Sequence, residues 1–272
     1  QDLEGLGFST ADLIKNRRLI EVPYGIVLIT GPTGSGKTTT LNSSLRFLAS
    51  EGNNNTTKED PIEIVHEQFN QIGVKPRINL TFANVLRNVL RQDPDIIMMG
   101  ETRDLETATN AIQAALTGHL VLSTLHTNDA PSAITRLIDL GVQPFLISSS
   151  LTGVAAQRLV RKICPHCQES YKVKVADLAP LDLGKDPQTE LELKMGKGCQ
   201  QCRNTGYLGR SGIFEVLPMS EKLNHLTNHK ASLADLQKAA LQEGMSTLQQ
   251  AAVDKMLRGI TTFEEVVRVT LG

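Results

Sequence analysis

Tryptophan is absent from this sequence, and aromatic residues make up only 4% of its 272 positions. Single-stranded nucleic acids are held largely by stacking of bases on aromatic side chains in a basic groove. The net charge is also close to zero, at −1, with 28 Lys and Arg against 29 Asp and Glu. The composition therefore argues against a nucleic-acid partner.

The sequence also lacks an apolar run of the roughly 18–20 residues that a membrane-spanning helix needs. Its N-terminus has no basic stretch followed by an apolar one, as a secretory signal would have. We therefore expect a cytoplasmic protein without direct membrane insertion. Because the first residue is Gln1 rather than Met, we also expect the chain to be a fragment of a longer protein.

The first half predicts an α/β fold. Apolar segments alternate there with amphipathic ones, which is typical of strands and crossover helices on a mostly parallel sheet. The predicted strands cover 24–30, 96–99 and 120–124. A helix is predicted over 81–91 from its apolar spacing, and a second helix begins after Asp104 and ends near Leu116, with Gly118 as its stop.

The second half changes character between Cys164 and Gly212, where proline, lysine and cysteine occur and hydrophobic periodicity is weak. We interpret this stretch as a small inserted module. Short helices are predicted after it, because start signals and stop glycines recur. The start signals are Ser232-x-x-Asp235, Thr247-x-x-Gln250 and Thr262-x-x-Glu265, and the stops are Gly244 and Gly259.

A phosphate-binding pattern, GxxxxGK[ST], follows the first predicted strand. Its glycines would let backbone N–H groups point at phosphate oxygens, Lys37 would contact the β and γ phosphates, and Thr38 would bind Mg²⁺. A chance match in a glycine-rich turn is the alternative, but the position between a strand and a helix favours ATP or GTP binding. The predicted nucleotide contacts are Gly31, Pro32, Thr33, Gly34, Ser35, Gly36, Lys37, Thr38 and Thr39.

A nucleotide hydrolase also needs a carboxylate near the γ phosphate, to hold Mg²⁺ or orient the attacking water. Glu101 is one candidate because it ends an apolar strand, although Gly100 stands where many such motifs have Asp. The acidic cluster from Glu59 to Glu63, interrupted by Pro61, is the other. An ordinary loop acid, or a solvated acidic face, is the alternative interpretation of each.

All four cysteines fall into two CxxC pairs, one at Cys164 and Cys167 and one at Cys199 and Cys202. Two such half-sites can complete a tetrahedral Zn²⁺ site with no cysteine left over. A thioredoxin-like redox pair is the alternative, but neither pair opens a helix after a strand. The sequence thus predicts a structural zinc site, with His166 outside the ligand set.

Five linked motifs then suggest a family. In chain order they are the phosphate loop, Glu59-Asp-Pro-Ile-Glu63, Arg91-Gln-Asp-Pro-Asp95, Gly100-Glu101-x-Arg103-Asp104, and Thr117-Gly-His-Leu120 followed by Ser123-Thr-Leu-His-Thr127. Together they resemble the secretion ATPase superfamily, specifically the motors of type II secretion and type IV pilus assembly. The resemblance runs from about Tyr24 to the C-terminus and implies a RecA-like P-loop NTPase core.

The resemblance implies catalytic roles for three residues. Glu63 would position the attacking water, Glu101 would help to hold Mg²⁺, and His126 would sense the γ phosphate, with His119 as a weaker candidate. One departure from the family is that the segment 53–58, before the acidic cluster, is polar rather than apolar. We therefore expect this strand to be an edge strand, short, or partly disordered.

The resemblance also implies assembly and partners. Family members are hexamers in which arginines reach the nucleotide from a flanking domain or a neighbouring subunit. The candidates here are Arg77, Arg91, Arg103, Arg158 and Arg210, and Arg210 is assigned to the nucleotide site. In the full-length protein we expect a homohexamer attached peripherally to the inner membrane through platform and accessory proteins, using ATP with Mg²⁺.

The predicted organisation has four parts. They are a remnant of a preceding domain or linker (1–21), the P-loop ATPase core (22–162), the zinc-binding tetracysteine module (163–212) and a C-terminal helical subdomain (213–272). Two other functions stay open from the sequence alone, a nucleic-acid translocase and a zinc-ribbon binding module that has kept a nucleotide switch. Stimulation by single-stranded DNA would favour the first, and a complete absence of turnover the second.

Overall fold

The computed structural model describes residues 2–49, 55–59, 70–73 and 95–272, with the backbone alone for 55–59 and 70–73. The chain forms two compact units, and each combines two separate ranges. The first unit consists of Gln1–Gln157 and Glu215–Met245, and the second of Arg158–Phe214 and Ser246–Gly272.

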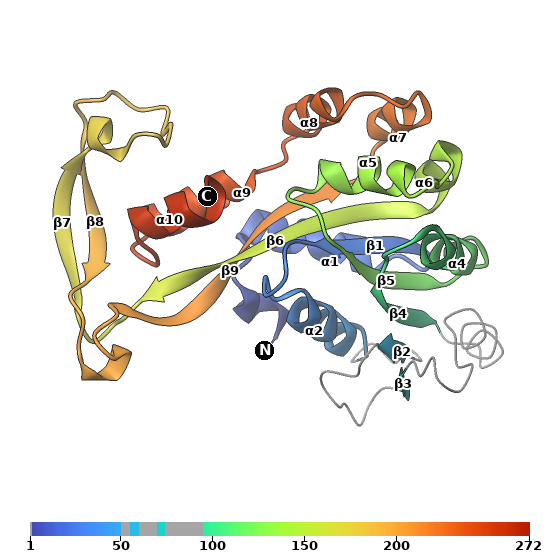
Figure 1. Ribbon diagram of the computed structural model, residues 1–272, viewed down its shortest axis with the longest axis horizontal. Coiled ribbons are helices and arrows are strands. Elements are labelled where there is room, and N and C mark those ends of the chain that lie inside the picture. The colour runs from blue at the N-terminus through green and yellow to red at the C-terminus, as the bar shows by residue number, and fades with distance from the viewer. Residues whose placement is uncertain (1, 50–54, 60–69, 74–94) are drawn as a thin grey trace. The chain divides into compact units, whose positions relative to one another are not determined.

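A seven-stranded sheet with the order β3-β2-β4-β5-β1-β6-β9 forms the framework (Figure 1). Strands β1, β4 and β5 are the three that the sequence predicts, and β1 pairs in parallel with both β5 and β6. The mostly parallel α/β architecture is therefore confirmed. The strand bounds are β1 Gly25–Thr30, β2 Asn55–Glu59, β3 Asn70–Gly73, β4 Ile96–Glu101, β5 Leu120–Leu125, β6 Leu151–Ile163 and β9 Tyr207–Pro218.

The polar segment before the acidic cluster forms β2, which pairs in parallel with β3 on one side and β4 on the other. The edge-strand alternative is therefore wrong, because β3 lies outside it in the sheet order. Backbone hydrogen bonds do not depend on side-chain polarity, so a polar strand is tolerated between two partners. The helix predicted over 81–91 lies outside the described residues.

Helices complete the first unit. Asp104 starts α4 as predicted, since its Oδ1 accepts a hydrogen bond from the backbone N–H of Thr107 at 2.8 Å, and Gly118 follows with a φ of 100°. Helices α7 and α8 pack against α6 and α5, respectively (Figure 1). The helix bounds are η1 Leu3–Leu6, α1 Thr10–Ile20, α2 Lys37–Ala49, α4 Leu105–Leu116, α5 Pro131–Asp139, α6 Pro144–Ser150, α7 Glu221–Asn228 and α8 Leu233–Gln242.

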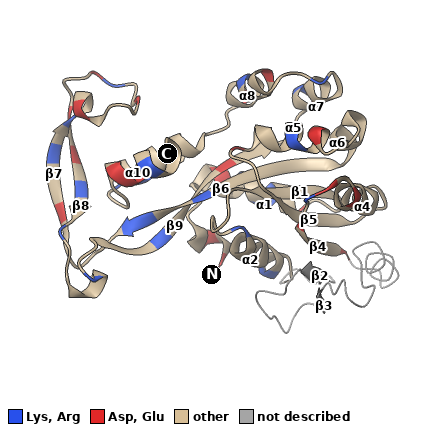
Figure 2. Cartoon of the chain, in the orientation of Figure 1, with Lys and Arg blue, Asp and Glu red and all other residues tan. Residues whose placement is uncertain are grey.

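The second unit contains an antiparallel hairpin, in which β7 (Gln168–Lys174) pairs with β8 (Glu190–Gly196). Both strands carry charged residues of both signs (Figure 2), and the ion pair between Lys172 and Glu190 crosses from one strand to the other at 3.0 Å. The remaining elements are η3 Val175–Leu178, η4 Gln200–Cys202, α9 Leu248–Leu257 and α10 Phe263–Thr270.

The predicted start and stop signals of the last helices are confirmed. The side chains of Ser232, Thr247 and Thr262 each accept a hydrogen bond from the backbone N–H three residues later. Only the pair Thr247 and Gln250 forms the reciprocal capping box, because the Gln250 side chain also accepts from the Thr247 N–H. The stop glycines, Gly244 and Gly259, have φ values of 88° and 71°.

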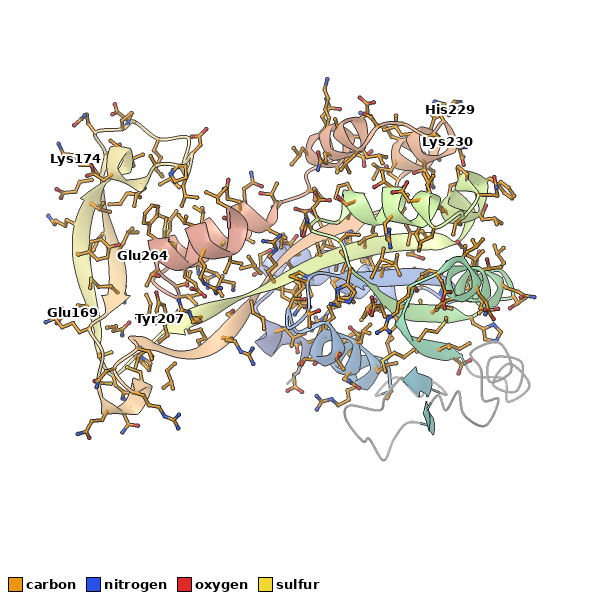
Figure 3. The ribbon with its side chains drawn as sticks, in the orientation of Figure 1. Glu169, Lys174, Tyr207, His229, Lys230 and Glu264 are labelled. Atoms are coloured by element: carbon orange, nitrogen blue, oxygen red, sulfur yellow. The ribbon has the colours of Figure 1, made fainter. Side chains whose placement is uncertain are left out.

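A buried carboxylate organises the second unit. The side chain of Glu265 is 0% exposed and forms ion pairs with Arg161 at 2.8 Å and Arg268 at 2.6 Å. Arg161 also lies over the ring of Tyr207, which is labelled in Figure 3, at 4.1 Å from the ring centroid. The Tyr207 hydroxyl lies 2.7 Å from that of Thr262. These contacts join β6, β9 and α10 within this unit.

None of the helices in the described part of the chain is both long enough and apolar enough to cross a bilayer.

Candidate functional site

The predicted phosphate loop joins β1 to α2. The strand ends at Thr30 and the helix begins at Lys37, so the loop delivers the backbone to a helix N-terminus. Gly31, Gly34 and Gly36 have φ values of 151°, 77° and 89°. At Gly31 there is also no room for a side chain, because a Cβ atom would lie 2.3 Å from the carbonyl oxygen of Gln157.

The Lys37 ammonium folds over this loop. Its Nζ donates to the carbonyl oxygen of Gly31 at 2.7 Å and to that of Pro32 at 3.0 Å. The N-terminal end of α2 carries a partial positive charge on the same side. The loop thus brings together a cation, the N-terminus of a helix and its dipole, which is the chemistry that binds an anionic phosphate.

Buried polar contacts connect the elements on both sides of the phosphate loop, β1 and α2, to other parts of the first unit. The hydroxyl of Thr40, on the first turns of α2, donates to Oε1 of Gln157 at 2.7 Å, and both side chains are buried. Thr30, at the end of β1, accepts from the backbone N–H of Thr127 at 2.8 Å, and the two hydroxyls lie 2.6 Å apart. The sequence did not single out Gln157 or Thr40, since contacts across about 100 residues leave no local pattern.

Glu101 and His126 meet at the same edge of the sheet as the loop. Glu101 is the last residue of β4, and His126 directly follows β5. Because β4, β5 and β1 are adjacent and parallel, their carboxyl ends lie side by side. Nε2 of His126 is 3.0 Å from Oε1 of Glu101, and Nε of Arg103 donates to Oε2 at 2.7 Å. The carboxylate is therefore oriented by two nitrogen groups, while its side chain stays 22% exposed.

The other predicted residues have different places. Glu63, Arg77 and Arg91 lie outside the described residues. His119 precedes β5, and its carbonyl accepts from the Gly25 N–H at the start of β1, so it lies at the opposite edge of the sheet from Gly31. This placement favours His126 over His119 as a nucleotide contact.

Two of the predicted arginines belong to the second unit. Arg158 donates to the carbonyl oxygen of Val269, and Arg210 is exposed on β9. Arg103 is the one predicted arginine that the structure places beside Glu101 among the described residues.

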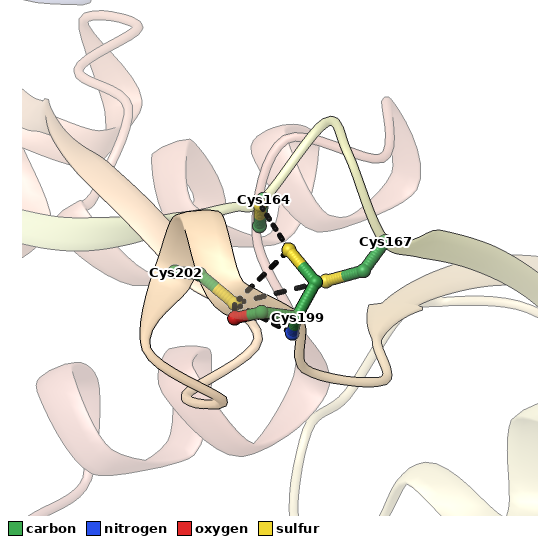
Figure 4. Close-up of side chains that lie close together, drawn as sticks. All are labelled: Cys164, Cys167, Cys199 and Cys202. Atoms are coloured by element: carbon green, nitrogen blue, oxygen red, sulfur yellow. Dashed lines mark hydrogen bonds between the residues drawn. The ribbon is translucent and has the colours of Figure 1, made fainter.

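The four cysteines form one cluster (Figure 4). Their sulfur atoms all lie within 4.8 Å of one another, with Cys164 and Cys199 at 3.9 Å, Cys167 and Cys202 at 3.8 Å, and Cys199 and Cys202 at 3.7 Å. A tetrahedron with metal–sulfur bonds of about 2.3 Å has edges of about 3.8 Å. The cysteines thus fit a four-thiolate zinc site, and they are not paired as disulfides.

Backbone N–H groups support the sulfur atoms. Those of Cys199 and Gly206 donate to Sγ of Cys202 at 3.2 and 3.3 Å, and that of Gly198 donates to Sγ of Cys167 at 3.3 Å. Burial opposes charge on Cys202, but these donors outweigh it and lower the pKa of its thiol to about 6. Burial raises the pKa of Cys167 to about 12. Hydrogen bonds from backbone N–H groups thus favour the thiolate of Cys202, which is the form that binds a metal.

Glycines beside the second cysteine pair allow the backbone to approach itself closely. A Cβ atom on Gly196 would lie 2.1 Å from the carbonyl oxygen of Gly206, and one on Gly198 would lie 2.9 Å from that of Asn204. At these points the backbone before Cys199 lies against the backbone after Cys202. Side chains at Gly196 or Gly198 would therefore distort the turn that carries the second cysteine pair.

Comparison with known proteins gives one family. The model of the Type II/IV secretion system protein family matches residues 1–268. The type IV pilus assembly ATPase TfpB of Acinetobacter baylyi is 49% identical over 269 residues, which are 99% of this chain and 46% of that protein. The type II secretion system protein E of Pseudomonas aeruginosa is 48% identical over 269 residues, which are 99% of this chain and 53% of that protein.

A solved structure agrees with these relatives. The crystal structure of the pilus retraction motor PilT with bound ADP superposes with a TM-score of 0.71 at 29% identity, and the alignment covers 99% of this chain and 66% of that one. The chain spans about half the length of the curated relatives it matches.

Proposed function

Because the chain belongs to the Type II/IV secretion system protein family, we propose that it is the nucleotide-hydrolysing part of a motor ATPase that powers type IV pilus assembly or type II protein secretion. The relatives named as a pilus assembly ATPase and as a type II secretion protein are similar to it at 49% and 48% identity. These close similarities support a shared motor activity and do not separate the two machines.

One observation carries the proposal. The phosphate loop, Glu101 and His126 lie at the carboxyl ends of three adjacent parallel strands, β1, β4 and β5, and meet at one edge of the sheet. Ligands of open α/β sheets bind outside the carboxyl ends of the strands, where loops and helix N-termini converge. A cation and a carboxylate at this edge are groups that nucleotide hydrolysis uses, and the imidazole of His126 lies beside the carboxylate.

The residues divide the work as follows. Residues 31–39, apart from Pro32, which has no N–H group, hold the phosphates through backbone N–H groups. Lys37 leaves the carbonyl oxygens of Gly31 and Pro32 to bind the β and γ phosphates. Thr38 and Glu101 offer a hydroxyl and a carboxylate, the oxygen ligands that Mg²⁺ prefers. Bound Mg²⁺ would neutralise charge that develops on the phosphates.

The hydrolytic step needs an oriented water. Glu63 accepts a hydrogen bond from this water in the proposed mechanism, while Glu101 maintains the surrounding oxygen network. His126, held by Glu101, relays the presence of the γ phosphate to β5. Arg210 contributes positive charge when domains or subunits close around the nucleotide.

The proposed function includes the assembly of the full-length protein and its attachment to partner proteins. The full-length protein works as a homohexamer on the cytoplasmic side of the inner membrane, attached through platform and accessory proteins of a pilus or secretion machine. The support for this arrangement is the family resemblance together with the names of the two relatives.

Zinc has a structural role in the proposal. The ligands Cys164, Cys167, Cys199 and Cys202 fill a four-coordinate shell and leave no open position for a substrate. Zinc binding would stabilise the two turns that carry the cysteine pairs and connect β6, the β7–β8 hairpin and β9.

The test measures ATP binding by calorimetry and phosphate release with the full-length protein. Lys37→Ala should abolish tight Mg-ATP binding, because it removes the cation that the loop presents to the phosphates. Lys222→Ala, a surface change on α7 in the same unit, is the matched control and should bind like the wild type. Unchanged affinity in Lys37→Ala would refute the proposed phosphate site.

A further inference from the structure

The pairing of β4 with β5 is interrupted next to Glu101. From Met98 to Glu101, β4 advances three residues, while β5 advances two, from Leu122 to Thr124. One extra residue on β4 forms a bulge directly before the carboxylate. Bulges beside active sites bend a strand and change the direction of the following side chain.

Ser123 lies opposite this bulge. Its hydroxyl donates to the carbonyl oxygen of Gly100 at 2.7 Å, and so supplies a hydrogen bond where the ladder is irregular. The Thr102 hydroxyl lies 2.9 Å from Ser123 Oγ. Because the Ser123 proton already points at Gly100, Thr102 must donate in this second hydrogen bond.

The chain of hydroxyls brackets Glu101 on both sides. Gly100, before it, is held by Ser123, and Thr102, after it, donates its backbone N–H to the carbonyl oxygen of Thr124 at 2.8 Å. The side chains of Ser123 and Thr102 are 0% and 4% exposed. Water does not compete for these buried hydroxyl groups, and each can donate in only one direction. Their hydrogen bonds therefore hold the backbone more firmly than those of hydroxyl groups exposed to water.

We propose that Ser123, with Thr102 as its donor, is a positioning residue for Glu101. It holds the bulge in the geometry that aims the carboxylate at His126 Nε2, 3.0 Å away, and at the phosphate edge of the sheet. The consequence for hydrolysis rests on the proposed function, but the orientation of Glu101 is a property of the chain itself.

The first experiment measures hydrolysis by the full-length protein. Ser123→Ala removes the hydroxyl that donates to the Gly100 carbonyl. The kcat should therefore fall by about tenfold to 100-fold, which is the usual loss when a residue that orients an active-site group is replaced. KM for ATP should not change, because the phosphate loop is untouched. Thr102→Val keeps the side-chain shape without the hydroxyl and should act in the same direction, whereas Thr102→Ser should retain wild-type kcat.

A matched control separates positioning from stability. Ser150 is also buried, at 4% exposed, and its hydroxyl donates to the Leu146 carbonyl within α6. Ser150→Ala removes a buried hydroxyl far from Glu101 in the chain and should lower thermal stability without lowering kcat.

The second experiment does not depend on turnover. Long-range ¹H–¹⁵N spectra of the His126 ring report whether Nε2 keeps its carboxylate partner. Ser123→Ala and Thr102→Val should shift this resonance towards its position in Glu101→Gln, and Ser150→Ala should not. The proposal is overturned if both variants keep the wild-type His126 signal, whether or not the protein hydrolyses ATP. If the full-length wild-type protein does not hydrolyse ATP, that result contradicts the proposed function and leaves the positioning of Glu101 to be judged from the His126 signal.

Discussion

Oε1 of Glu101 lies 3.0 Å from Nε2 of His126, and these two side chains come from the ends of neighbouring parallel strands, β4 and β5. The pair lies beside the strand that leads into the phosphate loop. A change in the position of either side chain therefore alters this direct contact. The pair is one of several links between the carboxylate motif and the histidine motif, beside the hydrogen bonds of Ser123 to Gly100 and of Thr102 to Thr124.

Glu101→Gln should lower kcat by about 10²-fold or more, because the amide keeps the size of the side chain but loses the charge that a carboxylate supplies. Calorimetric affinity for ATP should remain close to that of the wild type. Phosphate release by the full-length protein measures the effect, and Glu106→Gln, an exposed change in the first turn of α4, is the control. Wild-type turnover in Glu101→Gln would exclude a catalytic role for this residue.

Gly31→Ala should abolish nucleotide binding and destabilise the first unit. The new methyl group would lie 2.3 Å from the Gln157 carbonyl oxygen, at a φ of 151° that side chains rarely adopt. Gly5→Ala is the control, since no atom lies within 4 Å of the added Cβ. Thermal unfolding and ATP calorimetry check both variants, and equal behaviour of the two would contradict the close approach at Gly31.

Cys199→Ser should release the zinc that we expect at one ion per chain. Elemental analysis measures the metal, and limited proteolysis should show cleavage between Cys164 and Cys202, because metal binding supplies folding free energy to this segment. ATP affinity at the phosphate loop should be nearly unchanged.

The control for the zinc site is His166→Ala. His166 is exposed between two ligands, so its replacement should keep the metal. Freshly purified, reduced wild-type protein without zinc would refute the assignment.

Glu265→Gln should destabilise the second unit by about 3–5 kcal/mol, the scale for removing one partner of a buried ion pair. The fully buried carboxylate then no longer neutralises Arg161 and Arg268. Glu264→Gln changes the neighbouring, exposed position on α10 (Figure 3) and should change stability little. Urea unfolding is the appropriate measurement, because guanidinium would screen the charges.

The same carboxylate predicts a pH dependence. Burial alone would raise the pKa of Glu265, but hydrogen bonds from Arg268 and Arg161 outweigh it and lower the pKa to about 2. In the unfolded chain Glu265 binds a proton near its ordinary pKa of about 4.3, so the stabilisation is complete above that pH and is lost as the pH falls towards 2.

Urea unfolding of wild type and Glu265→Gln at several pH values isolates this effect, since zinc loss in acid affects both proteins. The difference between their unfolding free energies should shrink from pH 5 to pH 2. A constant difference over this range would contradict the lowered pKa.

Local signals in the sequence were sufficient for much of the fold. The phosphate loop, the apolar strands and the helix caps at Asp104, Ser232 and Thr247 each depend on residues within a few positions of one another. The cysteine pairs were also informative, because two CxxC half-sites with no cysteine left over restrict the possible pairings. These features are determined by short-range geometry and by the chemistry of the residue types.

Only the tertiary structure determined which strands, helices and side chains contact each other. Residues 215–245 join the first unit although they follow the cysteine segment in the chain, and β2 has partners on both sides despite its polar sequence. The contacts between Thr40 and Gln157 and between Ser123 and Gly100 depend on strand order and on one bulge. Such contacts join residues far apart in the chain, so their partners are fixed only when the sheet has formed, and no local pattern encodes them.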